Sequence, residues 1–309
     1  MNDSHTGASH LLDHINDMVQ PEFGKGRVAD YIPALARVPA KQFGMALYGV
    51  DGTFLTTGDA TQPFSIQSLS KLFALQLLMS QTGDAVWTRI GKEPSGGAFN
   101  SQLILEQDDG VPRNPFLNAG AIVVADMLES AGRHQPDRLL KYLRGLSGNM
   151  ALGVNQEVLA SELAHAHINR GLANLMKAHG RIDNDVESLL DIYCGQCAIE
   201  MSCVDLARAA LPLANGGRVE PSRESVITAS QAKRLNAVML TCGMYDAVGS
   251  FAYRVGLPAK SGVGGGIVAV APGKYSVAVW SPELDLSGNS YVGTAALGYL
   301  AEMTHTSIF

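Results

Sequence analysis

Apolar side chains recur every three to four residues in several parts of the chain, which is the spacing of one face of an α-helix. Residues 10–20 show this spacing in Leu12, Ile15 and Val19 and predict a helix near the N-terminus. Residues 68–83 show it again and end at a glycine, which commonly follows the last turn of a helix. The same spacing predicts further helices over residues 115–132, 136–147, 169–179, 202–215, 230–242 and 290–303.

Two of these helices begin at a recognisable start signal. Asn114-Pro115 places a proline at the first helical position, where its missing N–H would have no partner in any case. Ser202-x-x-Asp205 resembles a capping box, with Asp in the position that Glu usually occupies. These signals predict helix starts close to Pro115 and directly after Ser202.

Strand-like segments lie near both ends of the chain. Residues 43–57 form two short candidate strands joined at Asp51-Gly52, a dipeptide typical of hairpin turns. Late strands are predicted over residues 258–263, 266–271 and 275–281. Because an isolated hairpin is only marginally stable in water, we expect the early and late strands to share one antiparallel sheet. Terminal helices would then cover one face of the sheet and the helical insert the other.

This arrangement predicts an α+β fold in a single domain that spans residues 1–309. Its sheet-containing part covers about residues 1–65 and 245–309, and its helical part covers about residues 66–244. We expect a cleft where the two parts meet. The sequence shows no internal repeat, linker or low-complexity tract that would divide the chain further.

The composition is that of a globular protein. With 46% hydrophobic and 17% charged residues, the chain is too apolar and too weakly charged for intrinsic disorder. Its net charge of −6 argues against nucleic acid or a membrane surface as a partner, because both require a basic face. Glycine is in excess, with 33 residues gathered in short clusters, and these suit turns or parts of a functional site.

The N-terminal segment carries no export signal that we can identify. Its first twenty residues lack a basic region followed by an apolar run. No stretch of the chain approaches the ~18 consecutive apolar residues of a transmembrane helix. We therefore expect a cytoplasmic protein with no membrane partner.

The four cysteines are expected to be small buried thiols rather than disulfides. Cys194 and Cys197 form a C-x-x-C pair, which redox enzymes and zinc sites also use. Neither a second close cysteine pair nor a βαβ pattern accompanies it. A third ligand is also missing beside the close histidine pairs, His10 with His14 and His165 with His167. We therefore expect no metal.

Candidate chemistry begins with Ser68 and Lys71, which are three residues apart and share one face of a predicted helix. This S-x-x-K spacing occurs in serine acyl-transfer enzymes, where a neighbouring group must remove the hydroxyl proton. Lysine can remove that proton only as the neutral amine. Because the reference pKa of lysine is ~10.4, its surroundings must lower this pKa. Burial, a helix N-terminus or a second cation would each do so. If the pair stood alone, a helix-capping serine and a solvated lysine would be the preferred interpretation.

A second element makes the chemical interpretation more specific. Lys260-Ser261-Gly262 lies on a predicted late strand and matches the K-[ST]-G element that accompanies S-x-x-K in penicillin-recognising enzymes. Lys260 would be the second cation, and Gly262 would let a substrate lie close to the strand. The backbone N–H groups of Val263 and Ser68 would together form an oxyanion hole.

The glycine run that follows, Gly264-Gly265-Gly266, suits a bulge or a tight bend. A phosphate-binding loop is the rival interpretation of this run, but no Gly-Lys-Ser/Thr follows it. The S-D-N element of β-lactamases is not apparent between the two lysine motifs.

With these elements in place, the sequence resembles bacterial glutaminases of the serine-dependent, β-lactamase-like family, which hydrolyse L-glutamine to L-glutamate and ammonia. The order and spacing of the family's motifs agree with this chain over nearly its whole length. At Val248 and Ser250 the family often has Ser and Glu instead. The matching segments are ADYIPALA (29–36), PFSIQSLSK (63–71), GKEPSGGAFN (91–100), PRNPFLNAGAI (112–122), SELAHAHINR (161–170), DIYCGQC (191–197) and LTCGMYDAVGSFAYRVGLPAKSGVGGGI (240–267).

The resemblance implies a role for each matching residue. Ser68 would be the nucleophile and Lys71 its base, while Tyr245 would assist proton transfer and Tyr31 would lie near the substrate amide. The implied glutamine-binding residues are Ser68, Asn118, Glu162, Asn169, Tyr193, Tyr245 and Val263. The implied supporting residues are Gln67, Lys260 and Gly262. A carboxylate such as Glu162 suits the ammonium of a free amino acid, and Asn and Tyr side chains suit its carboxylate.

The resemblance also implies a β-lactamase/DD-peptidase-like fold, no cofactor, L-glutamine and water as reactants, and a homodimer or homotetramer. Two alternatives stay open at this point. One is a β-lactamase, penicillin-binding protein or esterase built on the same S-x-x-K and K-S-G centre. The other is a binding protein that kept the fold and senses an amino acid without turnover.

Overall fold

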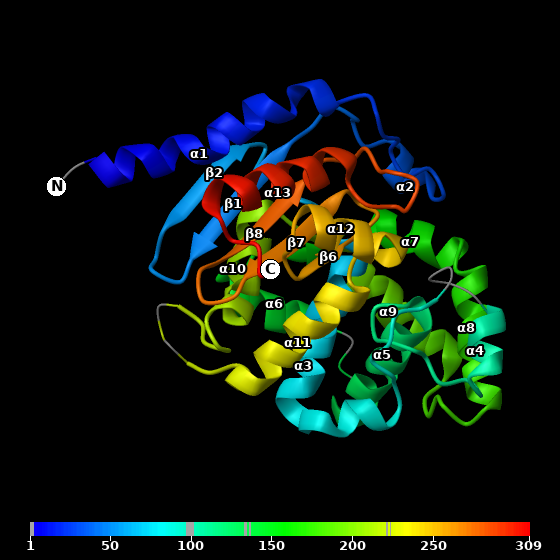
Figure 1. Cartoon of the computed structure of the whole chain (residues 1–309). Coiled ribbons are helices and arrows are strands. Elements are labelled where there is room, and N and C mark those ends of the chain that lie inside the picture. Colours follow the sequence, from blue (N-terminus) through cyan, green and yellow to red (C-terminus); the bar gives the residue numbers. More distant parts are fainter. Residues whose placement is uncertain (1–2, 97–101, 133–134, 136, 221, 223) are drawn as a thin grey trace.

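The computed structural model describes residues 3–96, 102–132, 135, 137–220, 222 and 224–309. Its centre is an antiparallel five-stranded sheet with strand order β2-β1-β8-β7-β6 (Figure 1). Strands from the two ends of the chain are therefore paired, and this confirms the predicted sheet. The strands are β1 (Gly44–Gly49), β2 (Phe54–Gly58), β6 (Ala259–Ser261), β7 (Gly266–Ala271) and β8 (Tyr275–Trp280).

The predicted hairpin joins β1 to β2 at Asp51-Gly52. Gly52 has a φ of +88°, a backbone conformation that residues with a Cβ rarely adopt. Its amide donates to the carbonyl oxygen of Gly49 at 3.0 Å and closes the turn. On its other edge β1 pairs with β8, where Ala46 lies opposite Ala278. This second pairing gives the hairpin the extra strand that it needs for stability.

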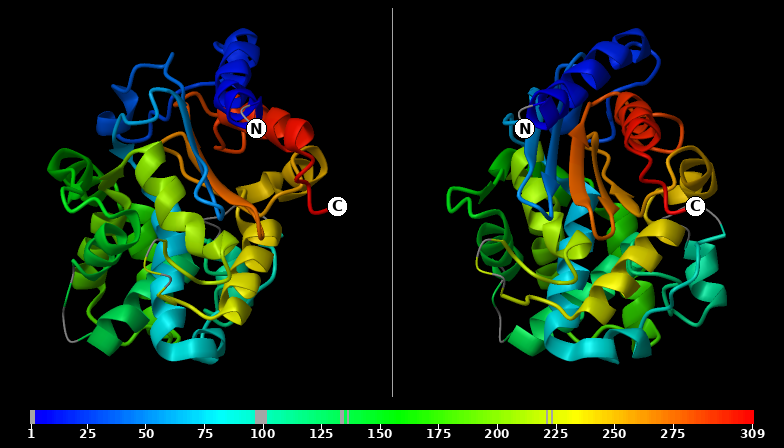
Figure 2. Two further views of the ribbon diagram at one scale, coloured as in Figure 1. Left: turned by 90° about the vertical axis from the view of Figure 1, so that its left-hand side faces the viewer. Right: turned by 60° about the vertical axis from the view of Figure 1, so that its left-hand side comes forward.

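Helices cover both faces of the sheet, as predicted (Figure 2). On one face, α1 (Asp3–Val19) and α13 (Tyr291–Thr304) pack against the strands and bury an apolar cluster with them. On the opposite face, α10 (Cys203–Ala214) lies against β1 and β8 and connects the sheet to a larger core in the helical part. The sheet therefore separates two apolar layers.

The helical part is organised around α3 (Ser70–Thr82), which is buried along most of its length. Its residues pack against α5 and α6 within the larger core. The other helices of the described chain are α2 (Pro33–Ala36), α4 (Gln102–Gln107), α5 (Asn118–Gly132), α6 (Arg138–Ser147), α7 (Gln156–Ala164), α8 (His167–Ala178), α9 (Val186–Cys197), α11 (Ala229–Cys242) and α12 (Val248–Arg254).

The helix start predicted at Pro115 is wrong. The side-chain oxygen of Asn114 accepts hydrogen bonds from the amides of Phe116 and Leu117, at 3.0 and 3.1 Å. Residues 115–117 therefore form a separate turn, and α5 begins at Asn118. By contrast, the capping box predicted at the start of α10 is present, with Ser202 and Asp205 bonded to each other's backbone amides.

Several elements were not predicted from the sequence. Helices α7 and α9 are absent from the predicted set, although both contribute to the site described below. A second, three-stranded sheet was also missed, because its strands are only two or three residues long. Its strands are β3 (Phe64–Ser65), β5 (Ile199–Met201) and β4 (Gly153–Val154). This small sheet connects the segment before Ser68 to the end of α9.

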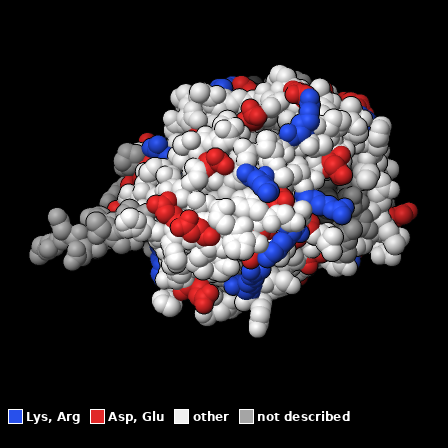
Figure 3. Space-filling model, turned by 90° about the horizontal axis from the view of Figure 1, so that it is seen from above, with Lys and Arg blue, Asp and Glu red and all other residues white. Residues whose placement is uncertain are grey.

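Figure 3 views the molecule from the side of α1 and α13. Acidic and basic side chains are interspersed over this face, and neither kind forms one continuous patch. Among the helices in the described part of the chain, none is long and apolar enough to cross a membrane.

Candidate active site

A cavity of about 350 Å³ lies where the sheet-containing part meets the helical part. Most of the residues proposed from the sequence line it, although they come from segments spread over some 230 positions of the chain. The lining residues that were predicted are Tyr31, Gln67, Ser68, Asn118, Glu162, Asn169, Tyr193, Tyr245 and Val263. The remaining three, Lys71, Lys260 and Gly262, are buried and support the cavity from behind.

Ser68 lies in a tight turn, Gln67–Leu69, directly before α3. Gln67 has a φ of +48°, which is unfavourable for a residue with a side chain and is often found at functional sites. Its side chain donates to the hydroxyl of Ser65 at 3.0 Å, and that hydroxyl donates to the carbonyl oxygen of Cys197 at 2.9 Å. The turn that carries Ser68 is therefore fixed to the end of α9.

Gly262 brings strand β6 against this turn. A Cβ at this position would lie 2.7 Å from the carbonyl oxygen of Ile66 and 3.3 Å from the amide nitrogen of Ser68. The sequence suggested that Gly262 makes room for substrate, whereas its close neighbour is the backbone before Ser68. The bend predicted at the following glycines is present, since the amide of Gly265 donates to the carbonyl oxygen of Gly262 at 3.0 Å.

Lys71 follows Ser68 by one helical turn and is fully buried. Its Nζ donates to the carbonyl oxygen of Phe116 at 3.2 Å and to Oδ1 of Asn118 at 2.6 Å. Burial lowers the pKa of Lys71 to about 8, because a charged ammonium is poorly solvated in the core. About a tenth of this amine is therefore neutral at pH 7, far more than for a lysine with the usual pKa of ~10.4.

Lys260 is also fully buried. Its Nζ donates to the carbonyl oxygen of Ser261 and lies 4.6 Å from the ring centre of Tyr245. Burial, followed by the positive charge of Lys71, holds the pKa of Lys260 well below its usual range. Of the causes that the sequence suggested for a lowered pKa of Lys71, which were burial, a helix N-terminus and Lys260 as a second cation, burial is the largest.

Tyr245 connects the two lysine motifs. Its φ of +51° places it in the left-handed region, and its hydroxyl lies near the side chain of Ser68 in the cavity lining. The same hydroxyl donates to the carbonyl oxygen of Ser261 at 3.5 Å. Burial raises the pKa of Tyr245 to about 12, so this phenol keeps its proton at neutral pH.

The opposite wall of the cavity carries a buried carboxyl group, Glu162, at the end of α7. The hydroxyl of Tyr31 shares its single proton between Oε1 of Glu162 at 3.1 Å and Oε1 of Gln67 at 3.3 Å. Burial raises the pKa of Glu162, while its hydrogen bonds to Tyr31 and Gln67 oppose that shift. An ammonium group entering the cavity would restore the solvation that this carboxylate has lost.

Polar side chains continue from Lys71 across the floor of the cavity. Nδ2 of Asn118 donates to Oδ1 of Asn169 at 2.9 Å, while Oδ1 of Asn118 accepts from Lys71. Tyr193 is buried on α9 and lines the cavity together with Cys197. Asn118 therefore contacts both Lys71, the predicted base, and Asn169, a second predicted binding residue. The sequence did not indicate either contact.

Three further residues line the cavity and were not proposed from the sequence: His165, Ile168 and Cys197. His165 lies at the end of α7, with Nδ1 2.7 Å from the carbonyl oxygen of Ser161. His165 follows Glu162 by about one helical turn. A prediction of α7 would therefore also have placed His165 at the site. The described cysteines are free and buried, as expected, and no cluster of metal-binding side chains occurs among the described residues.

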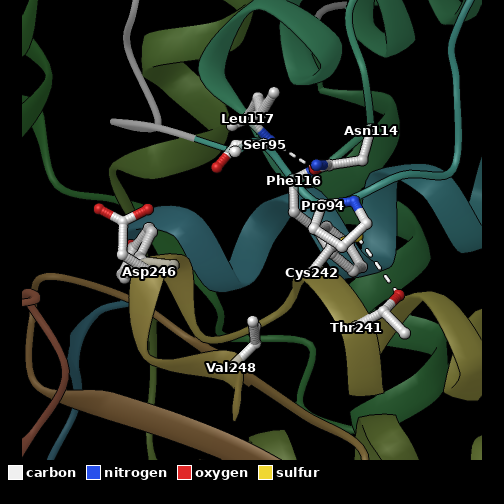
Figure 4. Close-up of a pocket in the computed structure, with 11 residues that line it drawn as sticks. Pro94, Ser95, Asn114, Phe116, Leu117, Thr241, Cys242, Asp246 and Val248 are labelled. Carbon is white, nitrogen blue, oxygen red and sulfur yellow. Dashed lines mark hydrogen bonds between the residues drawn. The ribbon is translucent and has the colours of Figure 1, made fainter. Parts of the chain in front are cut away.

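Figure 4 shows a neighbouring pocket that also has a volume of about 350 Å³. Tyr245 lines both pockets, so the two pockets lie next to each other. The labelled side chains come from residues 94–95, the turn before α5, the end of α11 and the segment after Tyr245. Part of the GKEPSGGAFN motif borders this pocket, and its residues 97–100 lie outside the described part of the chain.

A sequence model of the glutaminase family matches residues 26–309. The chain belongs to the glutaminase family. A glutaminase of Caulobacter vibrioides is 54% identical over 298 residues, which are 96% of this chain and 97% of that protein. The chain is therefore an amidohydrolase. The β-lactamase alternative is no longer needed to explain its S-x-x-K and K-S-G elements.

Solved structures of glutaminases have the same fold. A probable glutaminase named ybaS superposes with a TM-score of 0.91 at 34% identity, covering 97% of this chain and 99% of that one. A Bacillus subtilis glutaminase, YbgJ, superposes with a TM-score of 0.87 at 34% identity, covering 98% and 100%. That structure is a covalent complex with 5-oxo-L-norleucine, formed by reaction with 6-diazo-5-oxo-L-norleucine. The predicted β-lactamase-like α+β fold is confirmed by these similarities.

The close packing at Gly262 gives a first prediction. Gly262→Ala should lower the turnover of glutamine by about tenfold or more, because the added Cβ displaces the Ser68 turn from strand β6. Gly249→Ala on α12 is the matched control, since a Cβ there has open space around it. Steady-state ammonia release measures both variants. Equal activity of Gly262→Ala and the wild type would show that the packing does not matter.

Proposed function

We propose that the chain hydrolyses L-glutamine to L-glutamate and ammonia through an acyl-enzyme on Ser68. The observation that carries this proposal is the position of Ser68 in the cavity lining beside Tyr245, with a buried lysine one helical turn away. A serine hydroxyl needs such a neighbouring proton acceptor to become a nucleophile. The covalent complex of the Bacillus subtilis glutaminase supports a nucleophilic mechanism in the family.

In the first half-reaction, neutral Lys71 takes the proton of Ser68, directly or through the hydroxyl of Tyr245. Oγ of Ser68 forms a bond to the side-chain amide carbon of glutamine. The C–N bond then breaks, and ammonia leaves with the proton that Lys71 or Tyr245 returns. The product of this step is a γ-glutamyl ester of Ser68.

In the second half-reaction, water attacks the ester carbon. The same groups take a proton from the water and return one to Oγ of Ser68 as the C–O bond breaks. Glutamate is released and the enzyme regains its starting state. In both steps the negative oxygen would face the backbone amides of Ser68 and Val263. The close approach of β6 to the Ser68 turn supports this pairing of amides.

The remaining lining residues would hold the amino-acid part of the substrate. Glu162 would bind the α-ammonium, because it is the buried carboxyl group in the lining of the cavity. Asn118, Asn169 and Tyr193 would supply hydrogen bonds to the α-carboxylate. Tyr31 would fix Glu162 through their hydrogen bond of 3.1 Å and close that side of the cavity.

The nucleophile is tested by covalent labelling together with turnover. Ser68→Ala should lose measurable ammonia release and should take up no label from 6-diazo-5-oxo-L-norleucine in intact-protein mass spectra. Ser80→Ala is a matched control, because Ser80 lies on the same helix outside the cavity. Glutamine turnover by Ser68→Ala at the wild-type rate would overturn the nucleophile assignment. A lack of turnover in the wild type as well would favour a sensor.

The lowered pKa of Lys71 predicts a pH dependence. The base acts when it is neutral, so kcat/KM should rise about tenfold per pH unit on the acid side and level off above a pKa of about 8. Initial rates from pH 6 to 9 at low glutamine concentration provide the profile, since kcat/KM reports the free enzyme. Lys71→Arg should lose this activity over the whole range. A wild-type profile that is flat across this interval would contradict the role of Lys71.

The role of Glu162 predicts a difference between two substrates. Glu162→Gln should raise KM for glutamine by about 10- to 100-fold, because a charge-assisted hydrogen bond is lost. Glutaramate, the glutamine analogue without the α-amino group, should be turned over poorly by the wild type and equally poorly by Glu162→Gln. If the substitution weakened both substrates by the same factor, Glu162 would not be the ammonium site.

A further inference from the structure

Ser261, the middle residue of the K-S-G element, has no chemical role in the mechanism above. Its backbone is nevertheless at the centre of the site. Its carbonyl oxygen accepts hydrogen bonds from Nζ of Lys260 and from the hydroxyl of Tyr245, and its amide donates to the carbonyl oxygen of Gly243 at 3.2 Å. Its own hydroxyl donates to Oδ1 of Asn289 at 2.6 Å. The side chain of Ser261 therefore contacts Asn289, which does not line the cavity.

Asn289 connects two segments of the site. Its Oδ1 accepts from Ser261 on β6, and its Nδ2 donates to the carbonyl oxygen of Met244 at 3.3 Å. Met244 directly precedes Tyr245 in the chain. The side chain of Asn289 is almost completely buried, with an exposed fraction of 1%, so water does not compete for either bond. One amide group thus ties β6 to the segment that carries Tyr245.

Tyr245 needs such a restraint. Its φ of +51° lies in a region that is unfavourable for a residue with a side chain, and such a conformation persists only where the surroundings hold it. The hydrogen bond from Asn289 fixes the peptide group that immediately precedes this residue. Without it, the turn could relax toward negative φ and move the phenol away from Ser68.

The segment that carries Asn289 is itself well held. Oδ1 of Asp285 accepts from the amides of Ser287 and Asn289, at 2.8 and 3.0 Å, and the amide of Asp285 donates back to the carbonyl oxygen of Asn289 at 2.8 Å. The turn also packs against the site, since a Cβ at Gly288 would lie 3.7 Å from Val263 and 3.9 Å from the ring of Tyr245. Residues 285–289 therefore form a rigid support behind Val263 and the ring of Tyr245.

We propose that Asn289 is a positioning residue for the reaction, whose buried side chain ties strand β6 to the left-handed Tyr245 turn and keeps the Tyr245 hydroxyl against Ser68. The proposal rests on the role proposed above for Tyr245 in proton transfer. It assigns no contact with substrate to Asn289. Its function is to preserve a geometry that proton transfer requires.

The first test separates turnover from binding. Asn289→Ala should lower kcat by about 10- to 100-fold, the loss expected for a small displacement of a reacting group. KM for glutamine and Kd for glutamate should stay near the wild-type values, because Glu162, Asn118 and Asn169, which would hold the amino-acid part of the substrate, lie on other elements. Ser261→Ala, which removes one of the two hydrogen bonds, should lower kcat in the same direction. Wild-type kcat in both folded variants would overturn the proposal.

A purely structural role is separated by a control on the same sheet. Ser276 is a buried serine on β8 whose hydroxyl donates to the carbonyl oxygen of Ala207. Ser276→Ala should lower the melting temperature but leave kcat per folded molecule close to the wild type. Thermal unfolding followed by circular dichroism gives the folded fraction of each variant. If Ser276→Ala and Asn289→Ala lost kcat equally at equal folded fraction, Asn289 would have no special role.

The decisive test combines Asn289→Ala with Tyr245→Phe. If Asn289 acts through the Tyr245 hydroxyl, Asn289→Ala should have little further effect on kcat once that hydroxyl is gone. An equal loss in both backgrounds would overturn the positioning role. Wild-type kcat in Tyr245→Phe alone would instead contradict the proposed function of Tyr245. A large loss in Tyr245→Phe with none in Asn289→Ala would remove only the inference about Asn289.

Discussion

The burial of two lysine side chains at the junction of the sheet and the helical part is the constraint on which the site depends. Lys71 and Lys260 have exposed fractions of 2% and 0%. A charged ammonium in such surroundings is costly, so burial lowers the pKa of each side chain and raises the share of its neutral form. The fold thereby provides an amine that can accept a proton from the neighbouring serine. Burial in the core that stabilises the protein thus also lowers the pKa of the proposed base, Lys71.

The backbone around these lysines is held in unusual conformations. Gln67 and Tyr245 both have positive φ, and these two residues from different segments line the cavity together with Ser68. Each is restrained by buried hydrogen bonds, from Gln67 to Ser65 and from Asn289 to Met244. Rigid surroundings of this kind allow a strained but reactive arrangement to persist. The cost of the strain is offset by the packing of the two apolar layers on either side of the sheet.

The sheet and the pair of lysine motifs could be predicted from the sequence, because their signals are local. The hairpin at Asp51-Gly52 and the spacing of Ser68 and Lys71 each follow from a few adjacent residues. The binding residues could not be derived in this way. Glu162 and Tyr193 lie on α7 and α9, which the apolar spacing did not reveal, and only the resemblance to the glutaminase family indicated them. The cause of the lowered pKa of Lys71 also required the packed core, since burial has no local signature.

The most direct test of this account is the pKa of Lys71 itself. In protein labelled with lysine carrying 13C at Cε, the Lys71 signal is assigned by its loss in Lys71→Arg and then followed by NMR as a function of pH. The account predicts a titration midpoint of about 8 in the enzyme without substrate. A midpoint at the reference value of ~10.4 would show that the buried environment does not produce a neutral base. The proposed route of the Ser68 proton would then be wrong.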